Sequence, residues 1–266
     1  MCIRDSANTT YNILNFIKLG ENFQVSYTQA RDAEHPSGAW NYPSYCPVYD
    51  IAGMPTGSAI PTISATGRNI GNNPVTTPWR NRFDGSYTYS IFGNAFTEIQ
   101  ILKDLAFRSS FGIDYYSTTA KDLTQITYEN TENSTPPNSL SWSSVNSNSW
   151  TFTNTLTYTK SIGSHNFKVL MASEAINNFA QNLHGERTDL LIDDNDNYLV
   201  LDAGTGTQSS GGSISHSGLF SIFGRLDYNY SEKYIVNFTL RRDGSSKFGD
   251  NYRFGYFPAF ALGWRI

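Results

Sequence analysis

The C-terminal part of the chain alternates between apolar and polar residues with a period of two. Apolar side chains such as Phe238 and Leu240 occupy one parity, and polar ones such as Asn237 and Arg241 occupy the other. Successive side chains of a β-strand point to opposite faces, so this period predicts strands. Three such runs follow one another, over 220–230, 234–241 and 254–265.

The predicted strands are longer than those of most soluble sheets. The runs have 11, 8 and 12 residues, whereas strands in soluble domains usually end near 5–6 residues. A tilted strand that crosses a bilayer needs roughly 9–11 residues. Tyr228, Tyr230, Tyr234 and Trp264 gather aromatic rings at one end of the apolar parity, and aromatic girdles flank the apolar band of outer-membrane barrels. Pro258 lies inside the third run, where we expect a bulge because proline lacks a ladder donor.

The rest of the chain repeats this pattern and predicts about nine strands in all. Clear alternation occurs over 88–102, 105–115, 150–158 and 167–171, and weaker strands are expected over 11–18 and 23–28. Short turns are expected near 20, 103, 162 and 231, with long connections over 30–87, 119–147, 179–216 and 243–253. Short turns at one rim and long loops at the other are typical of outer-membrane barrels, which close with an even number of strands. An odd count therefore indicates part of a barrel.

Three segments near the C-terminus carry a more specific signal: FGRLDYNYSEKY, RRDGSSKFG and GYFPAFALGWRI. Together they resemble the barrel of the SusC/RagA family of TonB-dependent outer-membrane transporters, and the resemblance extends over most of 85–266. The family-motif residues that we expect to be structural are Arg225, Tyr228, Tyr234, Arg241, Asp243, Gly244, Ser245, Phe257, Pro258 and Trp264.

This resemblance implies an all-β fold, namely a partial transmembrane antiparallel β-barrel with short periplasmic turns and long extracellular loops. It implies a multi-pass protein of the Gram-negative outer membrane, in contact with lipid, that is a transporter and not an enzyme. The cargo would be an oligosaccharide or a peptide. The implied partners are a SusD-like surface lipoprotein and the TonB complex, which would act through an N-terminal region.

Composition adds limits. The chain has 266 residues, a net charge of −4 and only 16% charged residues, which argues against a nucleic-acid surface. Two cysteines, Cys2 and Cys46, form neither a disulfide framework nor a metal knuckle, and we expect no cofactor. The chain shows no signal-peptide pattern and no apolar run long enough for a membrane helix.

We therefore expect residues 11–266 to be part of a barrel domain whose plug, signal peptide and C-terminal strands lie outside this chain. Residues 1–10 are left unassigned. The opening segment MCIRDS fits no strand pattern, and both a native and a non-native start are open.

Three segments are candidate sites. Asp193, Asn195 and Asn197 alternate oxygen ligands as a calcium loop does, although the expected glycine and the closing glutamate are missing; a solvated loop is the alternative. Trp40, Tyr42 and Tyr45 could stack on sugar rings or grip a peptide, or could pack the loop onto itself. The segment 241–246 would form a turn at Asp243 and Gly244, with its arginines paired to carboxylates; a ligand role is the alternative.

Two other protein classes stay open at this stage. A secreted β-sandwich that binds carbohydrate or mediates adhesion would bury the apolar parity in a dry core. A β-rich glycoside hydrolase would need two converging carboxylates, whereas Asp114, Glu174 and Asp227 are isolated in the sequence. No metal or catalytic motif was found around the four histidines.

Overall fold

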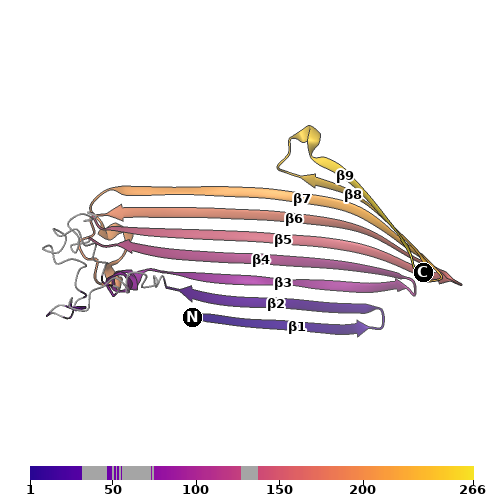
Figure 1. Ribbon diagram of the computed structural model, residues 1–266, viewed down its shortest axis with the longest axis horizontal. Coiled ribbons are helices and arrows are strands. Elements are labelled where there is room, and N and C mark those ends of the chain that lie inside the picture. Colours follow the sequence, from indigo (N-terminus) through magenta and orange to yellow (C-terminus); the bar gives the residue numbers. More distant parts are fainter. Residues whose placement is uncertain are drawn as a thin grey trace.

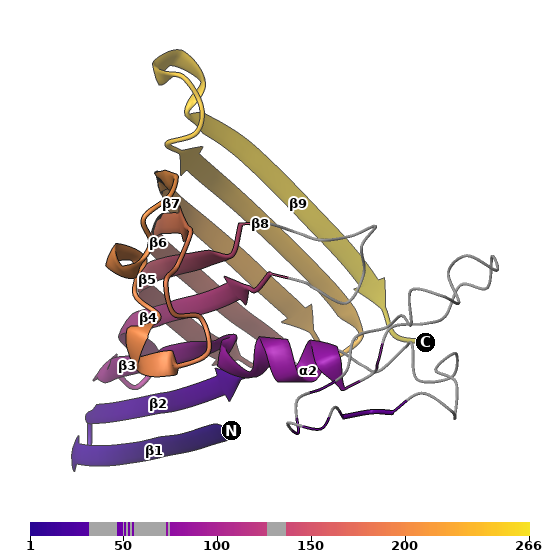
Figure 2. The ribbon, with the colours of Figure 1, turned by 90° about the vertical axis from the view of Figure 1, so that its left-hand side faces the viewer.

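The computed structural model describes residues 1–31, 47–49, 51, 53, 55, 73, 75–126 and 137–266. Within these residues nine strands form one antiparallel sheet, in which every strand pairs with its neighbours in sequence (Figure 1). The strands are β1 (Cys2–Leu14), β2 (Ile17–Ala30), β3 (Gly85–Leu102), β4 (Leu105–Thr124), β5 (Ser139–Ile162), β6 (His165–Thr188), β7 (Gln208–Tyr230), β8 (Tyr234–Ser245) and β9 (Phe254–Trp264). The sheet is bent along its width and stays open (Figure 2).

The register keeps the two parities of the sequence on opposite faces of the sheet. Phe238 pairs with Leu226 and Phe260, whereas Asn237 pairs with Asp227 and Ala261. We name the face that carries Phe238 the apolar face and the face that carries Asn237 the polar face. Apolar side chains on the first face are exposed, with Phe260 at 78%. A β-sandwich would bury such residues between two sheets, whereas the described residues form one sheet.

The short turns lie at one end of the sheet, which we call the turn end; the opposite end is the loop end. Turns at 103–104, 163–164 and 231–233 confirm the prediction. The first turn, however, is at 15–16, and the prediction of a turn near 20 is wrong. Gly20 lies inside β2 because the ring of Phe96 covers it: a Cβ there would come within 2.4 Å of that ring.

Four strands extend further toward the loop end than predicted. β4 continues to Thr124 and β5 begins at Ser139; β6 continues to Thr188 and β7 begins at Gln208. These ends fall inside the stretches 119–147 and 179–216 that were expected to be loops. Most residues of both parities are polar there, as in 146–149. A strand with polar residues on both faces shows no alternation. The period-two pattern therefore did not predict these strand ends.

Two predictions about β8 and β9 are also wrong. Asp243 and Gly244 continue β8 instead of forming a turn, and Gly244 accommodates the ring of Phe254, which would lie 2.4 Å from a Cβ. Pro258 pairs with Leu240 without a bulge. Arg265 N donates to Lys233 O, and in the same register Pro258 then falls at a non-hydrogen-bonded pair. Its missing N–H faces away from β8, so the ladder loses no donor.

The first residues form a strand, contrary to the expectation that MCIRDS fits none. Cys2–Leu14 make β1, which pairs in regular register with β2 from Cys2 opposite Thr28. Backbone pairing holds this segment although its side chains show little alternation.

Among the described residues, a small buried core lies at the loop end and not within the sheet. We call it the loop core; its members are Leu123, Leu140, Leu190 and Leu199, with Phe83 and Leu201 packed against them. It joins the ends of β4 and β5 to the short helices α2 (Thr76–Arg80), η2 (Asn81–Phe83), η3 (Asp196–Tyr198) and η4 (Leu201–Ala203). Another one, η5 (Asp250–Tyr252), precedes β9. No helix in the described part of the chain is long and apolar enough to cross a membrane.

Candidate functional site

The polar face carries a continuous row of hydrogen-bonding side chains across four strands. Thr153 of β5 pairs with Glu174 of β6, Glu174 with Ser221 of β7, and Ser221 with Asp243 of β8. Thr153 Oγ1 donates to a Glu174 carboxylate oxygen at 3.4 Å. We call these four residues the polar row. Alternation alone produces it, because each strand contributes every second residue to the same face.

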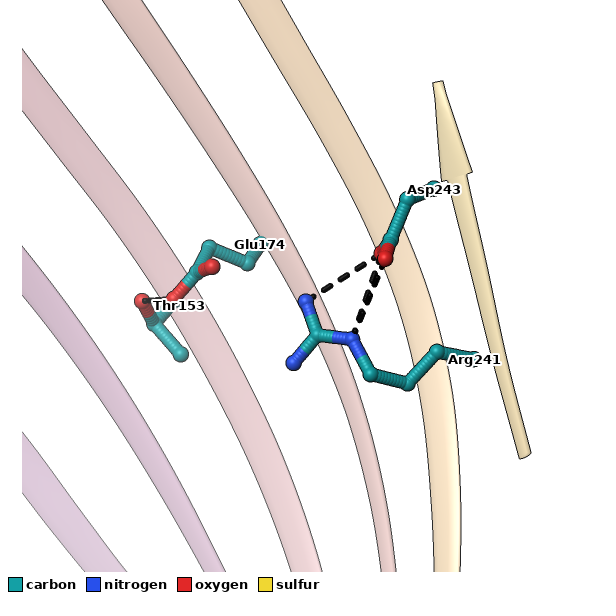
Figure 3. A network of polar contacts seen from close by, with 4 residues as sticks. All are labelled: Thr153, Glu174, Arg241 and Asp243. Atoms are coloured by element: carbon teal, nitrogen blue, oxygen red, sulfur yellow. Dashed lines mark hydrogen bonds and ion pairs between the residues drawn. The ribbon is translucent and has the colours of Figure 1, made fainter. Parts of the chain in front are cut away.

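Arg241 lies beside the polar row and forms an ion pair with its member Asp243. Its Nε and one terminal nitrogen donate to Asp243 at 3.2–3.3 Å, two residues further along the same face of β8. The guanidinium also lies over the ring of Phe223, 4.6 Å from its centroid. Figure 3 shows it reaching from β8 in the direction of Glu174 on β6. The expected pairing of this arginine with a carboxylate is therefore present.

Two further ion pairs lie on the polar face. Arg225 Nε is 2.8 Å from Asp227 Oδ1 within β7, and Arg108 of β4 is 3.7 Å from Glu98 of β3. Each pair is partly exposed, so each contributes little to stability. Each pair places one positive and one negative side chain on the polar face, so the pairs add no net charge to it. Asp227 and Glu174 were candidate carboxylates for the hydrolase alternative. Asp227 forms an ion pair with Arg225, and Glu174 accepts a hydrogen bond from Thr153.

The loop core has a polar partner network centred on Asn138, which is only 5% exposed. Its Oδ1 accepts from Leu190 N at 2.8 Å, and its Nδ2 donates to Leu190 O at 3.1 Å and to Asp193 Oδ2 at 3.0 Å. On the neighbouring strand end, Asp84 accepts from Leu123 N at 2.7 Å. Because these partners come from distant parts of the sequence, the network fixes the loop after β6 against the ends of β4 and β5.

The candidate calcium segment belongs to this loop. Asn195 Oδ1 accepts from Asn197 N at 3.1 Å, Asp193 accepts from Asn138, and Asp196 forms an ion pair with Lys121. The described residues contain no group of three or more His, Cys, Asp and Glu side chains suited to a metal. Calcium binding by Asp193, Asn195 and Asn197 stays a prediction.

One cation of η2, Arg82, lies near the same acidic segment. Burial lowers the pKa of Arg82, and the charges of Asp194 and Asp193 oppose that shift. The Arg82 guanidinium lies over the rings of Trp79 and Phe83, at 3.9 and 4.2 Å from their centroids. Phe83 also packs against the loop core, which includes Leu190 and Leu199, and this contact places η2 next to the loop after β6.

The loop aromatics Trp40, Tyr42 and Tyr45 lie outside the described residues. Their predicted role in binding sugar or peptide therefore stays a prediction. Sequence reasoning missed Asn138 and the four leucines of the loop core. Each is a single residue in a polar stretch, and no local period marks it.

Comparisons with known proteins bear on which family this architecture represents. No family model matches the chain. A segment of 115 residues is 36% identical to TonB-dependent receptor P3 of Formosa agariphila, covering 42% of this chain and 11% of that protein. A segment of 109 residues is 33% identical to TonB-dependent receptor SusC of Bacteroides thetaiotaomicron, covering 41% of this chain and 10% of that protein.

Solved structures extend the likeness to almost the whole chain. The RagAB peptide transporter matches 98% of it with a TM-score of 0.75 at 22% identity, over 30% of the matched chain. Over the matched segments the chain is similar to TonB-dependent receptors, and its fold resembles that of the RagAB peptide transporter. A ferric-catecholate receptor, Fiu of E. coli, shares the fold at a TM-score of 0.53 and 10% identity. The present chain thus spans less than a third of the RagAB chain and about a tenth of the curated relatives.

The motif residues of this chain divide between the two faces and the two ends of β7 to β9. At the turn end, Tyr228 Oη lies 2.8 Å from His165 Nδ1, and Tyr234 pairs with Trp264 in an aromatic girdle. At the loop end, Ser245 Oγ accepts from Lys247 N at 3.2 Å and begins the loop before η5. The remaining motif residues lie on the polar face (Arg225, Arg241, Asp243 and Phe257) or on the apolar face (Gly244 and Pro258).

Proposed function

We propose that this chain forms part of the wall of an outer-membrane transporter that imports oligosaccharides or peptides. The observation that carries the proposal is the separation of the sheet into an exposed apolar face with an aromatic girdle and a polar face with paired charges. A lipid-facing surface and a water-filled lumen require such a wall. The relatives named TonB-dependent receptor and SusC, and the likeness to a peptide importer, support import as the activity.

In this proposal the turn end lies toward the periplasm and the loop core lies outside the cell. Energy comes from the TonB complex, and a SusD-like lipoprotein covers the external opening. The likeness to RagAB, whose name pairs two components, supports a two-component assembly. The polar row offers hydroxyl and carboxylate groups that suit sugar hydroxyls or peptide amides. Trp40, Tyr42 and Tyr45 are the proposed aromatic contacts for the cargo.

Paired cysteine variants test the membrane placement. In a strain whose gene carries Cys2→Ser and Cys46→Ser, Phe238→Cys and Thr239→Cys are compared for labelling of whole cells by a water-soluble maleimide. Phe238 is 44% exposed in the isolated sheet, so only lipid on the apolar face can protect it. We expect label at 239 and none at 238 until the membrane is dissolved in detergent. Label at 238 in intact cells would refute the placement.

Uptake distinguishes the two cargo classes. In-frame deletion of the gene is expected to abolish growth on one oligosaccharide or peptide mixture as sole nutrient, and loss of TonB is expected to have the same effect. Growth of the deletion strain on every tested glycan and peptide would contradict import. The identity of the nutrient that fails then assigns the cargo.

A further inference from the structure

A cation lies on the apolar face near the loop end of β8. Arg242 pairs with Ile222 of β7 and Tyr256 of β9, so its side chain is on the face that carries Phe238 and Leu240. Arg241 and Asp243 point to the opposite face and pair with each other there. Alternation therefore separates Arg242 from the nearest carboxylate in the sequence.

Two other cations on this face have acidic partners, whereas none is found for Arg242 among the described residues. Lys121 pairs with Asp196 and Lys160 with Asp104. Arg242 contacts aromatic rings instead: its guanidinium lies 3.9 Å from the centroid of Phe254, and its Nε is buried without a hydrogen-bond partner. An unpaired cation in an apolar setting is costly, and such residues in membrane proteins mark ligand sites.

An apolar groove begins directly beside this cation. Its floor is Gly224 of β7, which pairs with Met171 of β6 and Leu240 of β8. A Cβ at Gly224 would find its nearest neighbour at 3.8 Å, so the glycine leaves open space that a side chain could fill. The groove has a volume of about 420 Å³. Its walls are apolar and include Met171, Ile222, Leu226, Phe238 and Leu240.

The depth of Arg242 fits the outer boundary of a membrane. It lies eight residues beyond Tyr234 of the aromatic girdle, which corresponds to about 26 Å along the strand. At the usual barrel tilt this is about 20 Å along the membrane normal, near the far edge of an apolar band about 25 Å tall. A cation at that level meets lipid head groups, and the groove beside it runs toward the acyl chains.

We propose that Arg242 and the Gly224 groove bind one phosphate-bearing lipid of the outer leaflet, with its phosphate on the Arg242 guanidinium and an acyl chain over Gly224. Charge complementarity and the adjoining apolar groove support a lipid as the occupant. A guanidinium binds phosphate oxygens in a fork, and a cation next to an apolar groove matches a charged head group joined to a hydrocarbon chain. This inference rests on the proposed membrane placement.

Native mass spectrometry of the protein extracted from outer membranes tests the site. Delipidated protein is titrated with phosphatidic acid or with diacylglycerol, which has the same acyl chains but no phosphate, in detergent. Arg242→Gln is expected to weaken phosphatidic acid binding about fivefold, because one cation near a charged head group contributes roughly that factor. Diacylglycerol binding is expected to stay unchanged, because this lipid has no phosphate for the guanidinium to bind. Arg242→Lys, which keeps the charge, is expected to retain most of the preference for the anionic lipid.

Two further variants separate the groove from the charge. Gly224→Val fills the floor and is expected to weaken both lipids equally, whereas Lys160→Gln, a paired cation on the same face at the turn end, is expected to change neither. Unchanged phosphatidic acid binding in Arg242→Gln, or displacement of the lipid by inorganic phosphate alone, would overturn the lipid site. Labelling at position 238 in intact cells, in contrast, would refute the membrane placement itself.

Discussion

Asn138→Ala is the sharpest test of how the loop core is held. The substitution removes both hydrogen bonds to the backbone of Leu190, which is 7% exposed, and the bond to Asp193. Each buried backbone group left without a partner costs about 1–3 kcal/mol, so the two groups of Leu190 lose roughly 2–6 kcal/mol of local stability. At the lower end, the Leu190 amide opens about 30-fold more often.

Hydrogen–deuterium exchange of the detergent-purified protein measures this opening. We expect faster exchange across 189–204, with the central residues of β5 and β6 unchanged, because local opening leaves the sheet paired. Asn197→Ala is the matched control, since Asn197 is an exposed asparagine of the same loop. Asn138→Asp is expected to be worse than alanine at neutral pH, because it places a second carboxylate beside Asp193. Unaltered exchange at Leu190 in Asn138→Ala would refute the argument.

Two further predictions concern packing. Leu140 is fully buried in the loop core, and Leu140→Ala is expected to cost about 2–5 kcal/mol and to make the loop after β6 sensitive to protease; resistance equal to that of the unaltered protein would contradict the core. Gly20→Val would place a side chain against the ring of Phe96 and is expected to cost about 1–3 kcal/mol. Denaturant unfolding measures the loss of stability. Gly224→Ala is the control, because a Cβ at that position has open space; an equal loss of stability in the two variants would refute the steric reason.

Period-two patterning was enough to predict the architecture wherever the two faces of a strand meet different environments. In β8, for example, Phe238 and Thr239 differ because one faces the apolar side and the other the polar side, and the alternation is clear. The turn at 231–233 was equally predictable because its residues interrupt two strong runs, and Ser231 and Glu232 there adopt positive φ.

The failures have a common physical cause, which is that contact with distant residues decided the outcome. Gly20 and Gly244 resembled turn residues, yet each makes room for an aromatic ring from the next strand. Pro258 suggested a bulge, yet the register places it where the strand pair needs no backbone N–H donor. The loop core joins Leu123, Leu140, Leu190 and Leu199 across stretches without any period. The sequence alone could not bring them together.

The neighbour-to-neighbour order of the strands has a consequence for how the wall is assembled. Every pairing joins strands that are adjacent in the chain, so no long connection has to be threaded past another element. Hairpins can be added one at a time, each using the edge left by the previous one. The entropy lost at each step is that of closing a single connection. The turn-end hairpins close over two or three residues, which makes them natural starting points for zippering, whereas the long connections are completed last.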